Sequence, residues 1–303
     1  MHPNQPKEYD AVLGSTATSY TGGVVLGGIE GVKYRLDRAN SQPSPEYIEQ
    51  KIAALKDALN YGQAGLELVI QALDDAEWHI HQTAYSILEK HRQARVEQAL
   101  HTYNTRLAQE LIKCYDAGER NFKGANLSGI YLPWAELCEV NLSEANLSEA
   151  YLNKAYLIEA DLSKANLNKI NLSNGELSQA NLNSTNLTYA NLNKADLSQT
   201  LLIKANLRGA DLSYANLTSA NLTEAILSWT NLSETNLSGA NLSHANLVGA
   251  KFTNLDLAEA NLCGAKLKGI NLNEVNLAGA YYNDKTDFPI GFMNYGQIRK
   301  LSP

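Results

Sequence analysis

The sequence predicts a solenoid that follows a small helical domain, and two observations carry this prediction. From Phe122 to Leu277 an apolar residue recurs every five residues, at 32 central positions of which 30 are Leu and two are Phe. The residue two before each centre is small or apolar, usually Ala, and the residue before the centre is usually Asn. Helices and strands, with periods of about 3.6 and 2 residues, do not produce this pattern. A solenoid functions through its surface. The second observation is a set of short apolar stripes at helical spacing before residue 120.

The repeat unit identifies a family. A unit such as Ala125-Asn126-Leu127-Ser128-Gly129 resembles the A(D/N)LXX signature of pentapeptide-repeat proteins. The resemblance covers more than half of the chain. It implies a right-handed quadrilateral β-helix with one unit on each side and four units in each coil. We number the positions of a unit 1 to 5, with the centre at position 3. The resemblance implies that positions 1 and 3 point inward and that the other three point outward.

The length of the repeat sets the size of the rod. Four units in each coil give about eight coils, and coils about 4.8 Å apart make a rod of about 38 Å. Asn recurs at position 2 in steps of 20 residues, so we expect Asn ladders that hydrogen-bond along the axis. Most outward Asn, Ser and Thr residues are therefore expected to be structural.

Both ends of a solenoid need covers, because exposed coil edges promote aggregation. The segment from Tyr115 to Phe122 resembles the beginning of other pentapeptide-repeat rods. The segment from Ala280 to Pro289 is similar to a common ending in the family. We expect Phe288, Phe292 and Met293 to cap the last coil.

The first 120 residues predict helices. Ser44 followed by Pro45 is typical of a helix start, and apolar residues at helical spacing continue to a stop at Gly62. Further helices are expected around Leu66–Leu73, around Trp78–Leu88 and over about 94–117. The run from Gly65 to Trp78 resembles a HEAT-type repeat over residues 46–100, which implies a protein-binding module. This combination suggests a cyanobacterial source.

Residues 11–35 are rich in Gly and repeat an Ala/Val-Val-Leu-Gly segment. We expect two short strands, or an extended arm, leading into a helix. The segment from Gly28 to Lys33 does not match a phosphate-binding loop. The expected domains are therefore an arm at 1–43, a HEAT-like domain at 44–119, the β-helix at 120–282 and a C-terminal cap and tail at 283–303.

Composition excludes several classes of function. Residues 1–120 carry 12 Lys/Arg against 16 Asp/Glu and residues 121–303 carry 13 against 16, so neither part predicts direct nucleic-acid binding. Three Cys residues fit a reducing compartment. The polar start of the chain predicts no signal peptide, and no apolar run reaches the roughly 20 residues of a spanning helix. We expect a cytoplasmic protein, with peripheral membrane association left open.

The sequence does not contain the usual patterns of catalysis. His79 and His81 are two residues apart, on different sides of a helix, and no pair of Cys residues has metal-binding spacing. Acidic residues on the rod follow the repeat without a neighbouring base. We therefore predict no enzyme activity, no catalytic residues, no cofactor and no metal.

Sorting outward residues by side predicts charged and apolar surfaces. Faces A, B, C and D begin at the centres 122, 127, 132 and 137. Face D forms an acidic face without Lys or Arg: Glu136, Glu139, Glu159, Glu176, Asp196, Asp256 and Glu259. Face B carries four basic residues against one Glu. Such a charged stripe attracts a basic partner in a salt-sensitive way.

Two groups of outward apolar residues also stand out, because apolar patches on a surface are typical of binding sites. The first patch, on faces C and D of the first coils, is expected to pack against the helical domain: Tyr131, Trp134, Tyr151, Tyr156 and Ile158. The second patch, on faces A and B, is the candidate partner surface: Tyr189, Leu201, Ile203, Ile226, Trp229 and Val248. Leu201 and Ile226 occupy sites where Asn is the rule.

These observations predict a non-enzymatic scaffold that binds other proteins, with self-association left open. One alternative is a DNA-mimic protein that acts on DNA gyrase, as the resemblance allows. Duplex DNA carries a charge about every 1.7 Å, or about 22 along such a rod, and the acidic face has far fewer. The other alternative is a peripheral component of a photosynthetic or other membrane protein complex.

Overall fold

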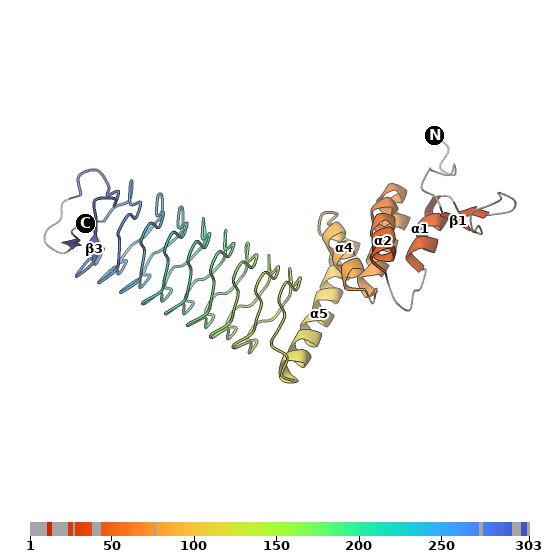
Figure 1. Ribbon diagram of the computed structural model, residues 1–303, viewed down its shortest axis with the longest axis horizontal. Helices are drawn as coiled ribbons and strands as arrows, with labels where there is room; N and C mark the ends of the chain where they lie inside the picture. Colours follow the sequence, from red (N-terminus) through yellow and green to blue (C-terminus); the bar gives the residue numbers. More distant parts are fainter. Residues whose placement is uncertain are drawn as a thin grey trace. The chain divides into compact units, whose positions relative to one another are not determined.

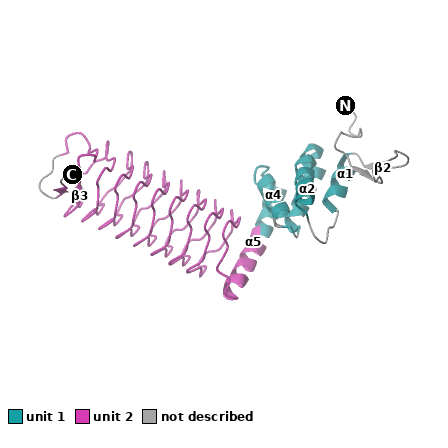
Figure 2. Ribbon diagram, in the orientation of Figure 1, with its two compact units in different colours: residues 1–103 teal, residues 104–303 magenta. Residues whose placement is uncertain are grey.

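The computed structural model divides the chain into two compact units, 1–103 and 104–303 (Figure 1 and Figure 2). The boundary falls inside helix α5, Ala94–Asp116. The structure describes residues 11–13, 24–26, 28–37, 44–75, 77–272, 275–292 and 298–301. Met293 and most of the Gly-rich arm lie outside these residues.

The first unit begins with the two strands and the helix that the Gly-rich segment predicts. Strand β1, Ala11–Leu13, pairs antiparallel with strand β2, Val24–Leu26. Helix α1, Gly28–Asp37, follows. The repeated Ala/Val-Val-Leu segments are therefore the two members of one small hairpin.

The predicted helices are confirmed, with boundaries set by local capping. Helix α2 spans Pro45–Ala58, and its N-cap Ser44 accepts a hydrogen bond from the backbone of Tyr47 at 3.3 Å. A 3₁₀ turn, η1 (Leu59–Tyr61), leads to helix α3, Gly62–Gln71. A second 3₁₀ turn, η2 (Ala72–Asp74), precedes helix α4, Trp78–Leu88, and then α5.

One buried ion pair joins two segments of this unit. The ammonium of Lys51 on α2 contacts Asp75 at 2.8 Å, with only 7% of the Lys51 residue exposed. Burial opposes the charge, but hydrogen bonds to Asp75 and Tyr47 leave the pKa of Lys51 above its ordinary value. The pair therefore ties α2 to the loop before α4 at a site where a lone charge would be unfavourable.

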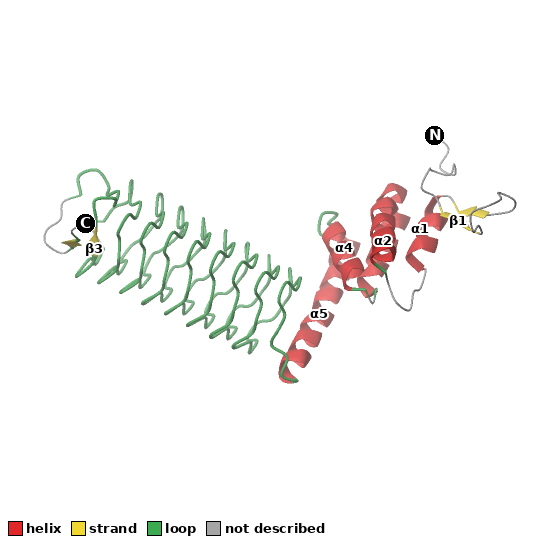
Figure 3. Cartoon of the chain, in the orientation of Figure 1, coloured by secondary structure: helices red, strands yellow, loops and turns green. Residues whose placement is uncertain are grey.

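The second unit is a four-sided β-helix in which every fifth residue bridges to the residue one coil further along. Parallel bridges join position 2 of each unit to position 2 of the unit 20 residues later, beginning with Asn121 and Asn141. This arrangement confirms the right-handed quadrilateral β-helix. Only one residue of each side is bridged, so Figure 3 draws the coils mainly as loop.

Each corner of the coil is a tight turn. The backbone N–H at position 1 donates to the carbonyl of the preceding centre, for example from Ile130 to Leu127 at 3.2 Å. Position 5 has a positive φ near 60°, as in type II turns, and 23 non-glycine residues of the described chain adopt it. A left-handed non-glycine residue costs about 1–2 kcal/mol. The ladders and the core must therefore offset a repeated backbone strain.

The interior is filled as the repeat predicts. The centres of the middle coils are at most 1% exposed, and Ala residues at position 1 fill the space beside them. Burying one Leu contributes about 1.5–3 kcal/mol. Thr replaces Ala at four buried sites, and the hydroxyls of Thr185 and Thr200 donate to the carbonyls of Leu182 and Leu197 at 2.7 and 2.6 Å. These buried polar groups are thus satisfied.

The end of α5 covers the first coil. Ala108 and Leu111 are buried in the same apolar cluster as the rod interior. The hydroxyl of Tyr115 donates to the carbonyl of Cys138 at 3.0 Å, and the guanidinium of Arg120 lies 3.7 Å from the centre of the Tyr115 ring. Burial raises the pKa of Tyr115. The rod therefore begins on a helix rather than on an open edge.

The last coil is covered by aromatic rings and by a returning segment. Phe288 stacks on Phe292 with ring centres 4.6 Å apart, and both pack against the core as predicted. Strand β3, Tyr281–Tyr282, pairs in parallel with strand β4, Arg299–Lys300. Ile298, which the sequence did not single out, is buried in the core beside it.

Candidate interaction surfaces on the rod

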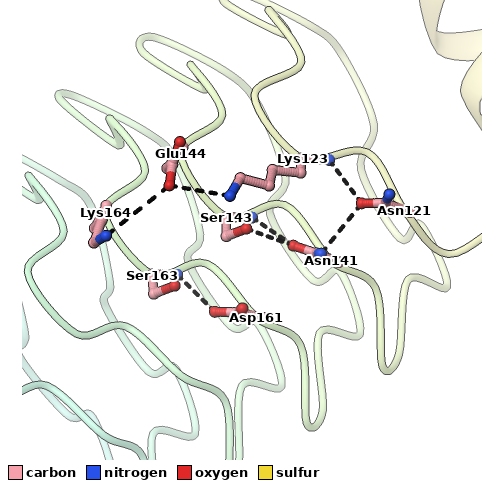
Figure 4. A network of polar contacts seen from close by, with 8 residues as sticks. All are labelled: Asn121, Lys123, Asn141, Ser143, Glu144, Asp161, Ser163 and Lys164. Carbon is pink, nitrogen blue, oxygen red and sulfur yellow. Dashed lines mark hydrogen bonds and ion pairs between the residues drawn. The ribbon is translucent and has the colours of Figure 1, made fainter.

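The outer polar residues at position 2 form the expected ladders. On face A, the side chain of Asn141 donates to that of Asn121 at 3.2 Å, and on face B the side chain of Asn166 donates to that of Asn146 at 3.1 Å. Each ladder oxygen also accepts from the backbone N–H at position 4, as Asn141 does from Ser143 at 3.0 Å (Figure 4). Position 2 is thus committed to the fold wherever it holds Asn or Asp.

Ion pairs follow the same axial rule. Glu144 lies between Lys123 and Lys164, 3.2 and 4.0 Å from their ammonium groups (Figure 4). Among the described rod residues, the other pairs between coils are Lys169 with Glu149 on face B and Lys204 with Glu224 on face A. Charges on these two faces are therefore partly neutralised along the rod.

Leu201 interrupts the face A ladder between Asn181 and Asn221. Its side chain cannot accept the backbone N–H of Ile203, which is the role of Asn at other ladder sites. The side-chain oxygen of Asn183, one coil earlier, accepts that N–H instead at 2.9 Å. The apolar residue is therefore compensated by a second change in the neighbouring coil, and 40% of Leu201 stays exposed.

Ile226 interrupts the face B ladder in the same way, between Asn206 and Asn246, with 39% of the residue exposed. Trp229 lies in the same repeat unit and is 62% exposed. Its backbone N–H donates to the carbonyl of Val248 at 3.3 Å, which brings these two residues of the second patch together. Face B thus has a continuous apolar group over two coils.

Aromatic residues at position 5 lie over glycines of the next coil. A Cβ on Gly209 would come within 2.7 Å of the Tyr189 ring, and one on Gly249 would come within 3.0 Å of the Trp229 ring. The rings are therefore exposed on one side and supported by backbone on the other. Tyr189 belongs to face B with Trp229, whereas Leu201 and Ile203 belong to face A, so the second patch spans two sides.

Sequence reasoning missed Tyr214, which lies on face C with 59% exposed. Its ring is 5.9 Å from the ammonium of Lys194, the position-5 residue of the preceding coil. The signal was available, because Tyr214 occupies the same position of its unit as Tyr189 and Trp229. It is an isolated aromatic residue outside both patches.

The first patch is exposed and internally packed. The rings of Tyr131 and Tyr151 meet at 6.1 Å with a tilt of 46°, and the ammonium of Lys154 lies 4.0 Å from the Trp134 ring. Tyr156 is also exposed, and Ile158 is partly exposed. Packing of this patch against the helical domain stays a prediction.

The acidic face contains two kinds of carboxylate. Asp196 and Asp256 belong to a ladder, where each accepts from a backbone N–H and from an Asn side chain at 2.9–3.0 Å. The remaining members are fully or partly exposed: Glu136, Glu139, Glu159, Glu176 and Glu259. Glu139 and Glu159 occupy the same position in adjacent coils, so like charges lie next to each other there.

Two searches for other kinds of site apply to the described residues. No cluster of three or more His, Cys, Asp or Glu side chains within them is arranged to hold a metal ion. No helix within them is long and apolar enough to cross a membrane.

Comparisons with known proteins place this geometry in a family. A search of curated proteins found no match. Among solved structures, the chain is similar to HetL, a pentapeptide repeat protein involved in heterocyst differentiation regulation in the cyanobacterium Nostoc sp. strain PCC 7120. That similarity has 35% identity, covers 60% of this chain and 90% of HetL, and has a TM-score of 0.31.

Two further structures are similar. QnrB1, a plasmid-mediated fluoroquinolone resistance protein, is 19% identical, with 55% of this chain and 86% of QnrB1 covered and a TM-score of 0.48. A pentapeptide repeat protein of the Arabidopsis thaliana thylakoid lumen is 30% identical, with 31% and 66% covered and a TM-score of 0.30. The family model for pentapeptide repeats matches residues 121–281 in overlapping copies, which is more than half of the chain. The chain therefore belongs to the pentapeptide-repeat family.

Proposed function

We propose that this protein is a non-enzymatic scaffold that binds another protein through the second patch on faces A and B. The observation that carries the proposal is the pair of ladder interruptions at Leu201 and Ile226. Each replaces a hydrogen-bonding residue with an apolar side chain that stays about 40% exposed. A repeat selected only for stability gains nothing from such a residue, since Asn at this site satisfies the backbone N–H directly.

The aromatic members of the patch support the same interpretation. Trp and Tyr are enriched at protein interfaces because they bury a large area at a small entropic cost. Tyr189 and Trp229 are each more than 60% exposed and rest on backbone, so they are already held in place before a partner arrives. Preorganised rings lose little freedom on binding.

The decisive experiment is capture of partners by the tagged full chain from its native organism, at low and high salt, with identification by mass spectrometry. The double variant Leu201→Asn/Trp229→Ser should fold normally, because Asn restores the ladder residue, and should lose the partner. The matched control is Tyr131→Asn/Trp134→Ser, which changes the same two repeat positions in the first patch and should keep it. Capture that survives Leu201→Asn/Trp229→Ser would rule out the second patch.

The DNA-mimic alternative receives less support from the acidic face. Two of its seven carboxylates, Asp196 and Asp256, are engaged by ladder hydrogen bonds. The same capture experiment tests this alternative. Recovery of gyrase subunits that high salt releases would replace the scaffold proposal with the mimic.

A further inference from the structure

A groove on the helical unit has a chemistry that the rod does not share. It lies between α2 and α4, has a volume of about 500 Å³, and is bounded by Ile52, Lys56, Leu59, His79, Gln82, Thr83, Ser86, Ile87, Lys90 and His91. On α2 the lining residues recur every three or four positions, and on α4 they do the same from His79 to Lys90. Two facing helical stripes therefore form its walls.

The lining of the groove contains no carboxylate, although the surrounding module is acidic. Residues 44–103 carry five Lys/Arg and nine Asp/Glu. Of the five cations, Lys51 pairs with Asp75 and Arg95 pairs with Glu67. Lys56 and Lys90 have no ion pair with any residue that the structure describes, and both line the groove. The module thus concentrates its uncompensated positive charge at this one place.

The groove also has an apolar part. Ile52, Leu59 and Ile87 are partly exposed and line it between the two lysines. Hydroxyl and amide groups add hydrogen-bonding capacity, and the hydroxyl of Thr83 is turned to the carbonyl of His79 at 2.7 Å. Apolar floors with a few polar groups at the edge are typical of peptide-binding grooves.

We propose that this groove binds an acidic peptide segment of a partner protein, with an apolar side chain seated between two or more carboxylates. Charge complementarity selects an anionic occupant, because both free cations are on the rim and no carboxylate repels it. The apolar residues select a peptide over a nucleic acid, whose backbone would need a longer basic track. The site is separate from the second patch, so either proposal can fail alone.

The ligand sequence is not needed to test the site. A random library of 12-residue peptides displayed on phage is selected on the immobilised full chain. It is counter-selected on the variant Lys56→Glu/Lys90→Glu. The recovered peptides should be enriched in Asp and Glu around Leu, Ile or Phe. Fluorescence anisotropy should then show at least a tenfold loss of affinity in the variant.

Controls separate charge from site. The variant Lys113→Glu/Lys285→Glu changes the net charge of the chain equally at exposed positions outside the groove and should bind the selected peptides like the unmodified chain. Ile87→Asp should weaken binding while leaving the helical circular dichroism signal unchanged.

Several results would overturn the proposal. Enriched peptides without an acidic bias, or equal affinity in the groove variant and the unmodified chain, would exclude the groove as an acidic-peptide site. Displacement of the peptide by a single-stranded oligonucleotide at lower concentration than by an unlabelled copy of the peptide would assign the groove to nucleic acid instead.

Discussion

Single residues on this rod are read in pairs that are 20 positions apart, because the coil places them next to each other. Tyr189 covers Gly209, Lys154 contacts Trp134, and Asn183 serves the backbone of Ile203. A substitution at one site therefore changes the environment of a partner one coil away. Two consequences can be measured.

Gly209→Ala should destabilise the fold more than Gly239→Ala. Both glycines have φ near +68°, so both variants lose about 1–2 kcal/mol from left-handed strain. At Gly209 the new Cβ would also meet the Tyr189 ring at 2.7 Å, whereas at Gly239 the closest contact is an ordinary 3.4 Å. Chemical denaturation should show the difference in the free energy of unfolding. Equal losses would mean that the ring does not rest on the glycine.

Asn183→Ala should cost about 1–3 kcal/mol, because the N–H of Ile203 loses its acceptor. Adding Leu201→Asn to that variant should recover much of the loss, since Asn supplies the acceptor used elsewhere in the ladders. Asn153→Ala is the control at the same repeat position, where the structure gives the side chain no hydrogen bond. A double-mutant cycle measures the coupling. Additive effects would contradict the compensation.

The sequence predicts the rod far better than its details. Positions 1 and 3 are buried and the ladders form, because a strict period leaves one way to fill the interior. The acceptor role of Asn183 was not predictable, because it depends on a side-chain rotation toward the next coil. Glycine beneath a ring was detectable as an aromatic residue followed 20 positions later by Gly. The groove between α2 and α4 depends on how two helices pack, which their separate apolar stripes do not determine.

The elements at the two ends differ in kind. The first coil is covered by the end of α5 and held by Tyr115, while the last is covered by Phe288, Phe292 and a strand pair. The helical cover was expected only as a helix up to about residue 117. Its burial in the rod core shows that the helix is part of the rod's fold.

Tyr115→Phe tests that cover. The variant should lose about 0.5–1.5 kcal/mol at neutral pH by deleting the hydrogen bond to the carbonyl of Cys138. Burial raises the pKa of Tyr115 above its ordinary value of 10.0. As the pH rises through 10, the unfolded chain therefore releases this proton first, and stability falls. The free energy of unfolding should decline less between about pH 9 and 11 in the variant than in the unmodified chain. Parallel curves would show that Tyr115 is not buried in this way.

Over the whole molecule, the caps determine whether the rod stays a single particle. Phe292→Ser should expose the end of the last coil and produce concentration-dependent association, measured by light scattering after size-exclusion chromatography. Ile290→Ser is the matched control, because Ile290 is 97% exposed and covers nothing. Association of both variants, or of neither, would show that Phe292 is not the cover.

The two candidate binding surfaces give the molecule different partners at different places. The second patch is apolar and neutral, so its binding should depend little on salt. The groove on the helical unit is cationic and its binding should weaken as salt rises. A scaffold with both could hold an apolar surface of one protein and an acidic segment of the same or another protein.

The 20-residue coil also makes the rod a ruler with a directional scale. Removing one full coil, such as residues 162–181, shortens it by about 4.8 Å and leaves every later side chain on its original face. Removing five residues instead turns everything downstream by a quarter of a revolution, which moves Trp229 from face B to face A and separates the caps from their register. Length can thus vary in steps of 20 residues without changing which side a partner meets.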